Sequence, residues 1–373
     1  MALVALAALA GGCQSRQSEL ETAHVNPAAA VTAARSTLFR QANSADAEAR
    51  TRAIETLGLM IGQQAGPVVM ENLSHPAVAV RFSAAMACGD CRYAPAGPKM
   101  RELLTAEGTD QSIQCAAIYC LHRLGDDTYT DRLAKILYDG QPEARANAAL
   151  VMGKLGLPAG IRPLYDRLRS EQDARVQFQI AESLAALRFD RSFGILTSKA
   201  WVGEPPEQLM AVQALGRTRS DRVKGDLIQA FGPDRAPPVR LAAAAGLARM
   251  GDNRGADMVL KAIRDPQGFA KESVGKSVQL TDAQIAQYKT LGALALGEMS
   301  GQPGAPDVLM ELLTDKDPTV TIAAAKSILN LLAPPELARP VVGAKGSAAT
   351  QPARPSAAPA VSPPVMRTAP PRE

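Results

Sequence analysis

Residues Glu143-Ala-Arg-Ala-Asn-Ala-Ala-Leu-Val-Met-Gly153 decide the fold of this chain, because their pattern recurs along most of its length. The anchor of each copy is the residue that follows its first apolar position. A small residue usually lies three positions after the anchor, and an apolar residue lies seven positions after it. The anchors are Arg50, Arg81, Gln114, Arg145, Gln177, Gln208, Arg240, Lys289 and Thr321. They are spaced by 31 to 33 residues, apart from one interval of 49. A near-constant period of this length predicts a stacked helical array.

Each repeat reads as two antiparallel helices. The positions three and seven after the anchor share one helical face, and a second apolar pair follows at positions nineteen and twenty-three. Between the two pairs lie helix-ending glycines and helix-starting polar residues, as in Gly125-Asp126 and Gly251-Asp252-Asn253. One such hairpin cannot bury its apolar face alone, so stacking is obligatory.

The pattern Val-Arg-x-x-Ala-Ala, as in Val80-Arg81 and Val239-Arg240, resembles the HEAT-repeat family. The short period is most similar to the subgroup first described in phycobilisome lyases. The resemblance covers residues 45–333 and implies an all-α solenoid of about eight and a half hairpins, with the second helices lining the concave side. We expect the ninth unit to keep only its first helix, because Pro334-Pro335 forbids a normal second one.

The N-terminal segment reads as a targeting signal. Residues 1–13 form an apolar stretch that ends in small residues before Cys13, which resembles the lipobox of bacterial lipoproteins. The resemblance implies that Cys13 carries lipid and that Gln14 favours the outer membrane. The leucine lies four residues before the cysteine and no basic residues precede the stretch, so we expect the natural start to lie upstream or to have been trimmed. A plain alanine-rich helix is the alternative.

Two further segments flank or interrupt the array. Residues 14–44 are predicted to be a polar tether followed by a helix from Asn26-Pro27 to about Gln41, which caps the first repeat. The long interval places an insertion near residues 265–282, which is either a mobile surface loop or a partner-contact loop. Residues 334–373 are rich in proline and alanine and are predicted to be disordered.

The cysteines are the strongest hint of chemistry. Cys88, Cys91, Cys115 and Cys120 invite a zinc site, but three of them occupy columns that hold core residues in other units. The sequence therefore favours core cysteines, with a disulfide as an alternative, and predicts no metal and no cofactor. Phosphate loops, nucleophile elbows and His-Glu pairs are missing, and the bilin lyase activity that the subgroup name implies has no motif here. We expect no enzyme.

Charge gives a limited clue to the partner. The net charge is +4, from 41 Lys and Arg against 37 Asp and Glu, which predicts no nucleic-acid partner. One basic cluster lies on the second helices of units two to four and includes Lys99, Arg132, Lys135 and Arg162. A solvated face is the usual meaning of such a cluster, and contact with an acidic partner is the sharper hypothesis.

These observations lead to one functional expectation. The chain is predicted to be a non-enzymatic scaffold on the bacterial cell envelope that binds another protein or an envelope polymer. A lipid anchor would hold it, facing the periplasm, with the outer membrane favoured. A lyase-like enzyme, or a domain that assists one, is the rival, and a purely structural spacer is a third option.

Overall fold

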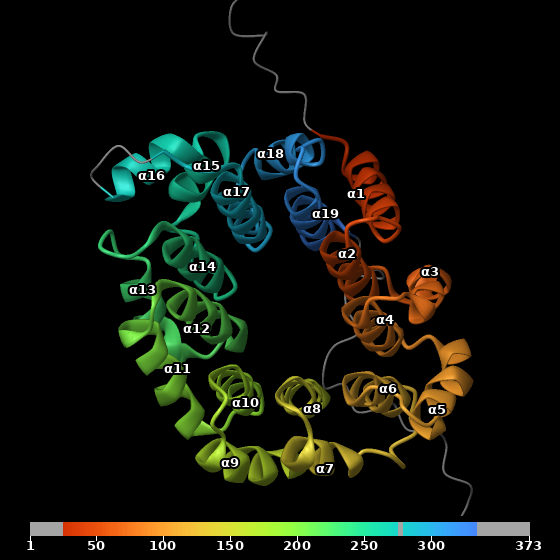
Figure 1. The fold of residues 1–373 in the computed structure, drawn as a ribbon. Helices are drawn as coiled ribbons and strands as arrows, with labels where there is room; N and C mark the ends of the chain where they lie inside the picture. Colours follow the sequence, from red (N-terminus) through yellow and green to blue (C-terminus); the bar gives the residue numbers. More distant parts are fainter. Residues whose placement is uncertain (1–24, 275–278, 334–373) are drawn as a thin grey trace, which may run out of the picture. The chain divides into compact units, whose positions relative to one another are not determined.

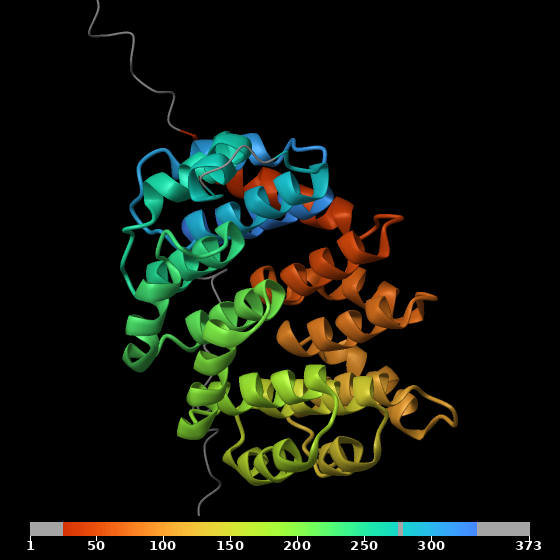
Figure 2. The same cartoon turned by 60° about the vertical axis from the view of Figure 1, so that its left-hand side comes forward.

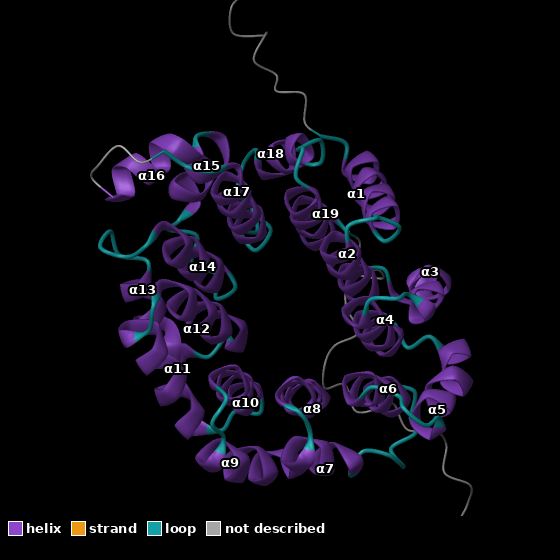
Figure 3. Cartoon of the chain, viewed as in Figure 1, coloured by secondary structure: helices purple, strands orange, loops and turns teal. Residues whose placement is uncertain are grey.

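Paired helices make up the part of the chain that a computed structural model describes, residues 25–274 and 279–333 (Figure 1). Colouring by secondary structure shows helices and loops and no strand within those residues (Figure 3). The all-α prediction is confirmed. The first helices of the nine units are α2 (Ala47–Met60), α4 (Val78–Asp90), α6 (Gln111–Arg123), α8 (Pro142–Leu155), α10 (Ala174–Ala186), α12 (Pro205–Thr218), α14 (Pro237–Ala248), α17 (Asp282–Leu296) and α19 (Pro318–Leu332).

The second helices follow the first ones along the chain and, apart from α11, are shorter than them. They are α3 (Gly66–Glu71), α5 (Gly97–Thr105), α7 (Arg132–Asp139), α9 (Ile161–Ser170), α11 (Asp190–Val202), α13 (Lys224–Ala230), α15 (Ala256–Arg264) and α18 (Ala305–Leu312). Two helices lie outside this series, α1 (Pro27–Gln41) and α16 (Pro266–Val274). Short 3-10 turns enter or extend several second helices, at Gly62–Ala65, Asn72–Ser74, Ala94–Ala96, Pro158–Gly160 and Asp221–Val223.

Burial follows the repeat columns. Every residue three or seven positions after an anchor is buried, from Ala53 and Leu57 in the first unit to Ala324 and Ile328 in the last. Successive first helices approach closely, because small residues face each other at each joint. A side chain on Gly153, for example, would lie 2.7 Å from the Cβ of Ser183 on the next first helix. Close packing of this kind joins the hairpins into one array.

The anchor column has a structural role of its own. In units one to seven its side chains donate hydrogen bonds to carbonyl oxygens at the end of the preceding helix or in the loop that follows it. Arg145 donates to the carbonyl of Gly140 (2.9 Å) and Gln177 donates to the carbonyl of Glu171 (2.7 Å). These carbonyls have no partner within their own helix, so a donor of this reach satisfies them. The column therefore prefers arginine and glutamine because it ties each unit to the one before.

The two ends of the array meet. Helix α19 packs against α2, and α1 packs against both α19 and α2. In the other units the second helix packs against the first helix that comes next, as α3 does against α4, so α1 occupies the place of the missing second helix of unit nine. Figures 1 and 2 both show α1 beside α19. Helix α1 thus caps the first repeat and also takes the place of the missing second helix of unit nine.

The residues of α1 explain why it packs against α19 and α2. Asn26 caps its N-terminus by accepting hydrogen bonds from the amides of Ala28 and Ala29, as expected from the Asn-Pro pair. Ala30, Ala34 and Leu38 follow at intervals of four and are fully buried. They form the same small and apolar stripe that a regular second helix presents.

Figure 1 shows the first helices on the inside of the array and the second helices outside them. The expectation that second helices line the concave side is therefore wrong. The physical reason is the small-residue column, which lets successive first helices pack closely against one another at every joint except that between α10 and α12, while the second helices lie on the wider outer circumference.

The described part of the insertion is a helix rather than an open loop. Phe269 and Ala270 of α16 are buried, and the Phe269 ring meets the Tyr288 ring edge-on at 5.7 Å. Leu280 is also buried, and Thr281 starts α17 with a capping box. This part of the insertion thus contributes to the core between units seven and eight.

Several predictions fall outside the described residues. They are the signal and lipid attachment at Cys13, the tether before residue 25, residues 275–278 of the insertion, and the tail from residue 334. Within the described ranges, every helix is too short or too polar to cross a membrane.

Candidate functional site: a charged band on the inner face

One charged side chain per unit occupies the inner face near the C-terminal end of each first helix. The positions are five or nine residues after the anchor, which place them on one helical face. We call this set the inner band, and it consists of Glu55, Asp90, Arg123, Lys154, Glu182, Arg217, Arg249, Glu298 and Lys326. The band contains five basic and four acidic side chains and so carries one excess positive charge.

Units two to four share a buried cluster. The Tyr119 hydroxyl donates to one Asp90 oxygen (2.5 Å), and the Lys154 amine donates to the other (2.9 Å). The Lys154 nitrogen also lies 4.8 Å from the centre of the Tyr119 ring. Burial, together with the charge of Asp90, raises the pKa of Tyr119 far above its usual value, so the phenol stays protonated. These contacts fix three successive first helices to one another.

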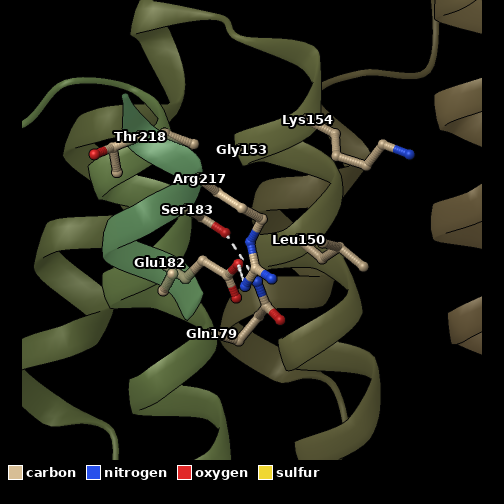
Figure 4. Close-up of a pocket in the computed structure, with 10 residues that line it drawn as sticks. Leu150, Gly153, Lys154, Gln179, Glu182, Ser183, Arg217 and Thr218 are labelled. Atoms are coloured by element: carbon tan, nitrogen blue, oxygen red, sulfur yellow. Dashed lines mark hydrogen bonds and ion pairs between the residues drawn. The ribbon is translucent and has the colours of Figure 1, made fainter. Parts of the chain in front are cut away.

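A cavity of about 160 Å³ opens between α8, α10 and α12. Figure 4 shows Arg217 reaching across it to pair with Glu182, while Gln179 donates to the Ser183 hydroxyl (3.3 Å). Leu150 and alanines supply an apolar wall. The cavity lies where α10 and α12 make few direct contacts with each other, because α11 packs against both. It combines apolar surface with convergent polar groups, as binding pockets do.

Units seven to nine hold the third part of the band. The Arg249 guanidinium donates to Glu298 (3.0 Å), and both side chains are mostly buried. Burial, opposed by the charge of Glu298, lowers the pKa of Arg249. Burial and then the positive charge of Arg249 lower the pKa of Lys326 on α19. Charges from non-consecutive units therefore influence one another on the inner face.

The band is suited to binding rather than to a particular reaction. Its charges are of both signs and most are paired, and two large apolar side chains on the same face are exposed, Leu59 (41%) and Met210 (46%). No group of three or more histidine, cysteine or acidic side chains in the described ranges is placed to hold a metal ion.

The residues predicted to contact a partner lie on the outer helices. Lys99 pairs with Glu102 on its own helix (2.6 Å), and Lys135 is exposed. Arg132 donates to the Leu104 carbonyl (3.3 Å) and lies over the Tyr129 ring. Arg162 is 92% exposed and 3.7 Å from Asp166. The structure brings these residues to the outside but does not gather them into one site, and most of them already have partners in the chain.

The four cysteines of units two and three are buried free thiols. Burial raises the pKa of Cys91 to about 11 and that of Cys115 and Cys120 to about 12. Cys120 lies in the small-residue column, where the Cα of Cys120 faces Gly89 of the preceding unit. The prediction that Cys88, Cys115 and Cys120 fill the core is confirmed, and Cys91 is buried as well.

Sequence reasoning missed the inner band. Its signal was present, because the column nine positions after the anchor holds Asp90, Arg123, Lys154, Arg217, Arg249 and Glu298. The family resemblance implies that second helices line the inner face, and on that arrangement the charges near the end of the first helices would lie outside. Only the packing order of the helices reveals which face is inside.

Comparison with known proteins supports the repeat type. The family model of HEAT repeats matches residues 98–185 and 203–278. A comparison with curated proteins finds no match.

Solved structures give distant likenesses. The complex of CpcE and CpcF of phycocyanin lyase from Nostoc sp. PCC7120 is 18% identical, with 74% of this chain and 98% of that one covered and a TM-score of 0.37. Human deoxyhypusine hydroxylase is 16% identical, with 71% and 99% covered and a TM-score of 0.32. An engineered protein is 18% identical, with 82% and 94% covered and a TM-score of 0.28. Likeness at this level carries no argument about activity. The described chain is thus an all-helical array with HEAT repeats in residues 98–185 and 203–278.

Proposed function

We propose that this protein is a non-enzymatic scaffold that holds a segment of a partner protein against the inner face of its first helices. The observation that carries the proposal is the inner band, because one charged side chain from each of nine units is presented on a single face. A segment that lies along this face would meet many modest contacts, which is how helical-repeat surfaces bind.

The mixed charges favour a protein over a polyanion. A nucleic acid or an acidic polymer needs a surface of one dominant sign, whereas the band contains nearly equal numbers of acidic and basic side chains. The exposed Leu59 and Met210 and the cavity beside Arg217 add apolar contacts between the charges. A peptide segment with both apolar and charged side chains complements this combination.

Anchoring to the envelope is a second part of the proposal. Cys13 would carry lipid and hold the array at a membrane surface facing the periplasm, with the outer membrane favoured. Mass spectrometry of the protein purified from envelopes tests this part. A lipid-modified N-terminal cysteine supports it, and an unprocessed Met1 removes it.

Photo-crosslinking in intact cells tests the binding face. A photoreactive amino acid replaces Met210 or Leu59 on the inner face, and Ile228 or Val202 on the second helices serves as the matched control, since all four are exposed apolar residues. We expect a defined partner from the inner positions and none from the outer ones. Crosslinks from the outer positions alone would reject the inner face as the binding surface.

Charge reversal of Arg132 and Arg162 tests the outer cluster separately. The double variant Arg132→Glu, Arg162→Glu changes side chains that lie on the outside and leaves the inner band intact. We expect partner capture to stay unchanged. Loss of capture would move the binding face to the second helices.

A further inference from the structure

The turn from the first helix to the second has a left-handed backbone in each of the eight hairpins. Five units place glycine at this position, Gly62, Gly125, Gly156, Gly251 and Gly301, and three place arginine, Arg92, Arg188 and Arg219. The φ angles of these arginines are 51°, 62° and 52°. Glycine adopts such angles freely, whereas the Cβ of an arginine lies too close to a carbonyl oxygen. Residues kept in a strained conformation of this kind cluster at ligand-binding sites.

Two of the strained arginines begin the same four-residue motif in neighbouring units. The motifs are Arg188-Phe-Asp-Arg191 in unit five and Arg219-Ser-Asp-Arg222 in unit six. The last arginine of each motif contacts the unit before. Arg191 donates to the Tyr165 hydroxyl (2.6 Å), and Arg222 lies 3.1 Å from an Asp190 oxygen. Because Asp190 belongs to the first motif, the Arg222 ion pair holds the two turns next to each other.

The first arginines of the motifs, Arg188 and Arg219, are free. Both are exposed, and their side chains make no hydrogen bond, ion pair or ring contact with any residue that the structure describes. The two motifs contain four arginines and two aspartates, so they carry two excess positive charges. Charged groups nearby on the first helices are already balanced in pairs, Arg217 with Glu182 and Lys154 with Asp90. Two guanidiniums therefore remain available at these turns.

The cavity between α8, α10 and α12 opens beside the same turns (Figure 4). Its lining includes Ala186, two residues before Arg188, and Thr218, which directly precedes Arg219. Its volume of about 160 Å³ is below the roughly 300–1,000 Å³ of small-molecule sites. A mainly apolar cavity of about 150 Å³ still accepts a group as large as benzene. The cavity therefore suits one large apolar side chain.

We propose that the cavity and the two free arginines form one site, which takes a partner segment with a large apolar side chain between acidic residues. The apolar side chain enters the cavity, and the flanking carboxylates pair with Arg188 and Arg219. A guanidinium binds a carboxylate through two parallel hydrogen bonds, and both guanidiniums have their donors free. The proposal rests on the proposed function and deepens it, because it assigns the chemistry of the segment at this part of the inner face.

Arg92 shows that a strained turn alone does not make a site. The turns on either side of it hold Gly62 and Gly125, so it has no neighbouring arginine of the same kind. No residue next to Arg92 lines the cavity. Arg92 is nonetheless exposed and has the same left-handed backbone. Arg92→Gly is therefore the matched control for Arg188→Gly and Arg219→Gly.

The first test measures stability without any partner. Glycine relieves the backbone strain, so we expect each of the three arginine-to-glycine variants to keep the Tm of the full chain or to raise it by roughly 1–3 °C. A fall of more than about 2 °C in Arg188→Gly or Arg219→Gly would show that the side chain stabilises the array, and the proposal would then fail.

The second test measures binding to the full chain by fluorescence anisotropy at low ionic strength. The probe is an end-capped peptide in which one leucine lies between two pairs of glutamates. We expect the double variant Arg188→Gly, Arg219→Gly to weaken binding about 10-fold or more and Arg92→Gly to retain it. Glutamine in place of glutamate, or alanine in place of leucine, should weaken binding to a similar extent. Equal affinity of wild type and double variant, or no binding to the wild type, overturns the proposal.

A third variant tests the cavity without touching the arginines. Ala186 is an exposed residue of the cavity wall, so Ala186→Leu fills the cavity from outside the core. We expect this variant to bind the leucine peptide no more tightly than the wild type binds the alanine peptide. Unchanged affinity for the leucine peptide would reject the cavity as the apolar half of the site.

Vesicles that contain phosphatidylglycerol separate a peptide from a membrane as the source of negative charge. Vesicle binding that is lost in the double variant, without peptide binding, would overturn the peptide assignment. Failure of the crosslinking at Met210 and Leu59 with normal peptide binding would reject the proposed function and keep this site. Normal crosslinking with no peptide binding would reject this site alone, so the two proposals can fail independently.

Discussion

Glu171 is a fully buried charged side chain and Lys326 is a half-buried one, and the two differ in their partners. The Glu171 side chain is fully buried at the end of α9, the second helix of unit four, and accepts bonds from Arg145 (2.7 and 2.8 Å), from Arg167 (2.9 Å) and from the amides of Gln172 and Asp173 (2.9 Å each). The Lys326 amine on the inner face makes no hydrogen bond or ion pair within the part of the chain that the structure describes. Both oxygens of the Glu171 carboxylate have hydrogen-bond donors, whereas the Lys326 amine has no acceptor among the described residues.

The partners of Glu171 show what makes a buried charge part of the structure. Burial opposes the charged form of Glu171, but hydrogen bonds from Arg145, the chain amides and Arg167 outweigh it and lower its pKa to about 2. Such a site is complete without a ligand and ties α8 to the end of α9. Burial of a charge by itself therefore indicates no function.

Removal of Glu171 should have the largest effect. Glu171→Ala leaves Arg145 and Arg167 without their shared carboxylate in a place that is mostly shielded from water, where their side chains are 13% and 18% exposed. We expect the free energy of unfolding to fall by about 3–5 kcal/mol. Urea denaturation measures this loss, and a decrease below about 1 kcal/mol would show that the saturated site contributes little.

Acid titration should reveal the same site through its pKa. The pKa of Glu171 is about 2 in the folded protein and near 4.5 when unfolded, so its contribution is present above pH 4.5 and is lost as the pH falls toward 2. We expect about 3 kcal/mol of wild-type stability to disappear across this window beyond the loss in Glu171→Gln. Denaturation midpoints at several pH values measure the difference. Parallel curves for the two proteins would contradict it.

The fork geometry of Arg145 gives a smaller prediction. Arg145 donates two bonds to Glu171 and one to the Gly140 carbonyl, which a lysine cannot reproduce. Arg145→Lys keeps the charge, and we expect a loss of about 1–2 kcal/mol by urea denaturation. Arg175→Lys is the control, because Arg175 is 85% exposed and its carboxylate partner lies at 3.5 Å. Equal effects would mean that charge alone matters at Glu171.

Much of the fold can be predicted from the sequence, because each position of the repeat has one structural role in every unit. The apolar positions, the glycine breaks and the Asn26-Pro27 start of α1 all have local causes, and the structure places them as predicted. The closure of the array has no local cause. Nothing within residues 27–41 indicates that α19, almost 300 positions later, is their partner, since the stripe of Ala30, Ala34 and Leu38 fits any unit of the array.

The candidate site was less predictable for a related reason. Periodicity identifies which residues share a face, but it does not say whether that face points inward or outward. Lys99 and Arg162 looked equivalent to Lys154 and Lys326 as exposed cations in a repeat. The distinction depends on the number of units that close the array and on partners in units far apart, and both are properties of the assembled chain.

The smallest predicted effect concerns Glu55, the acid that faces Lys326 from across the joint between the two ends of the array. Glu55→Gln keeps an acceptor for the Ser83 hydroxyl but removes a negative charge that favours the lysine. We expect a loss of about 0.5 kcal/mol in the wild type and none in Lys326→Met, so the double-mutant cycle gives a coupling of the same size. Urea denaturation of all four proteins at low salt measures it. A coupling appears only if the closed array brings α2 and α19 together in solution and if Lys326 is charged there. Its absence would remove the contrast with Glu171, because a neutral lysine needs no counter-ion.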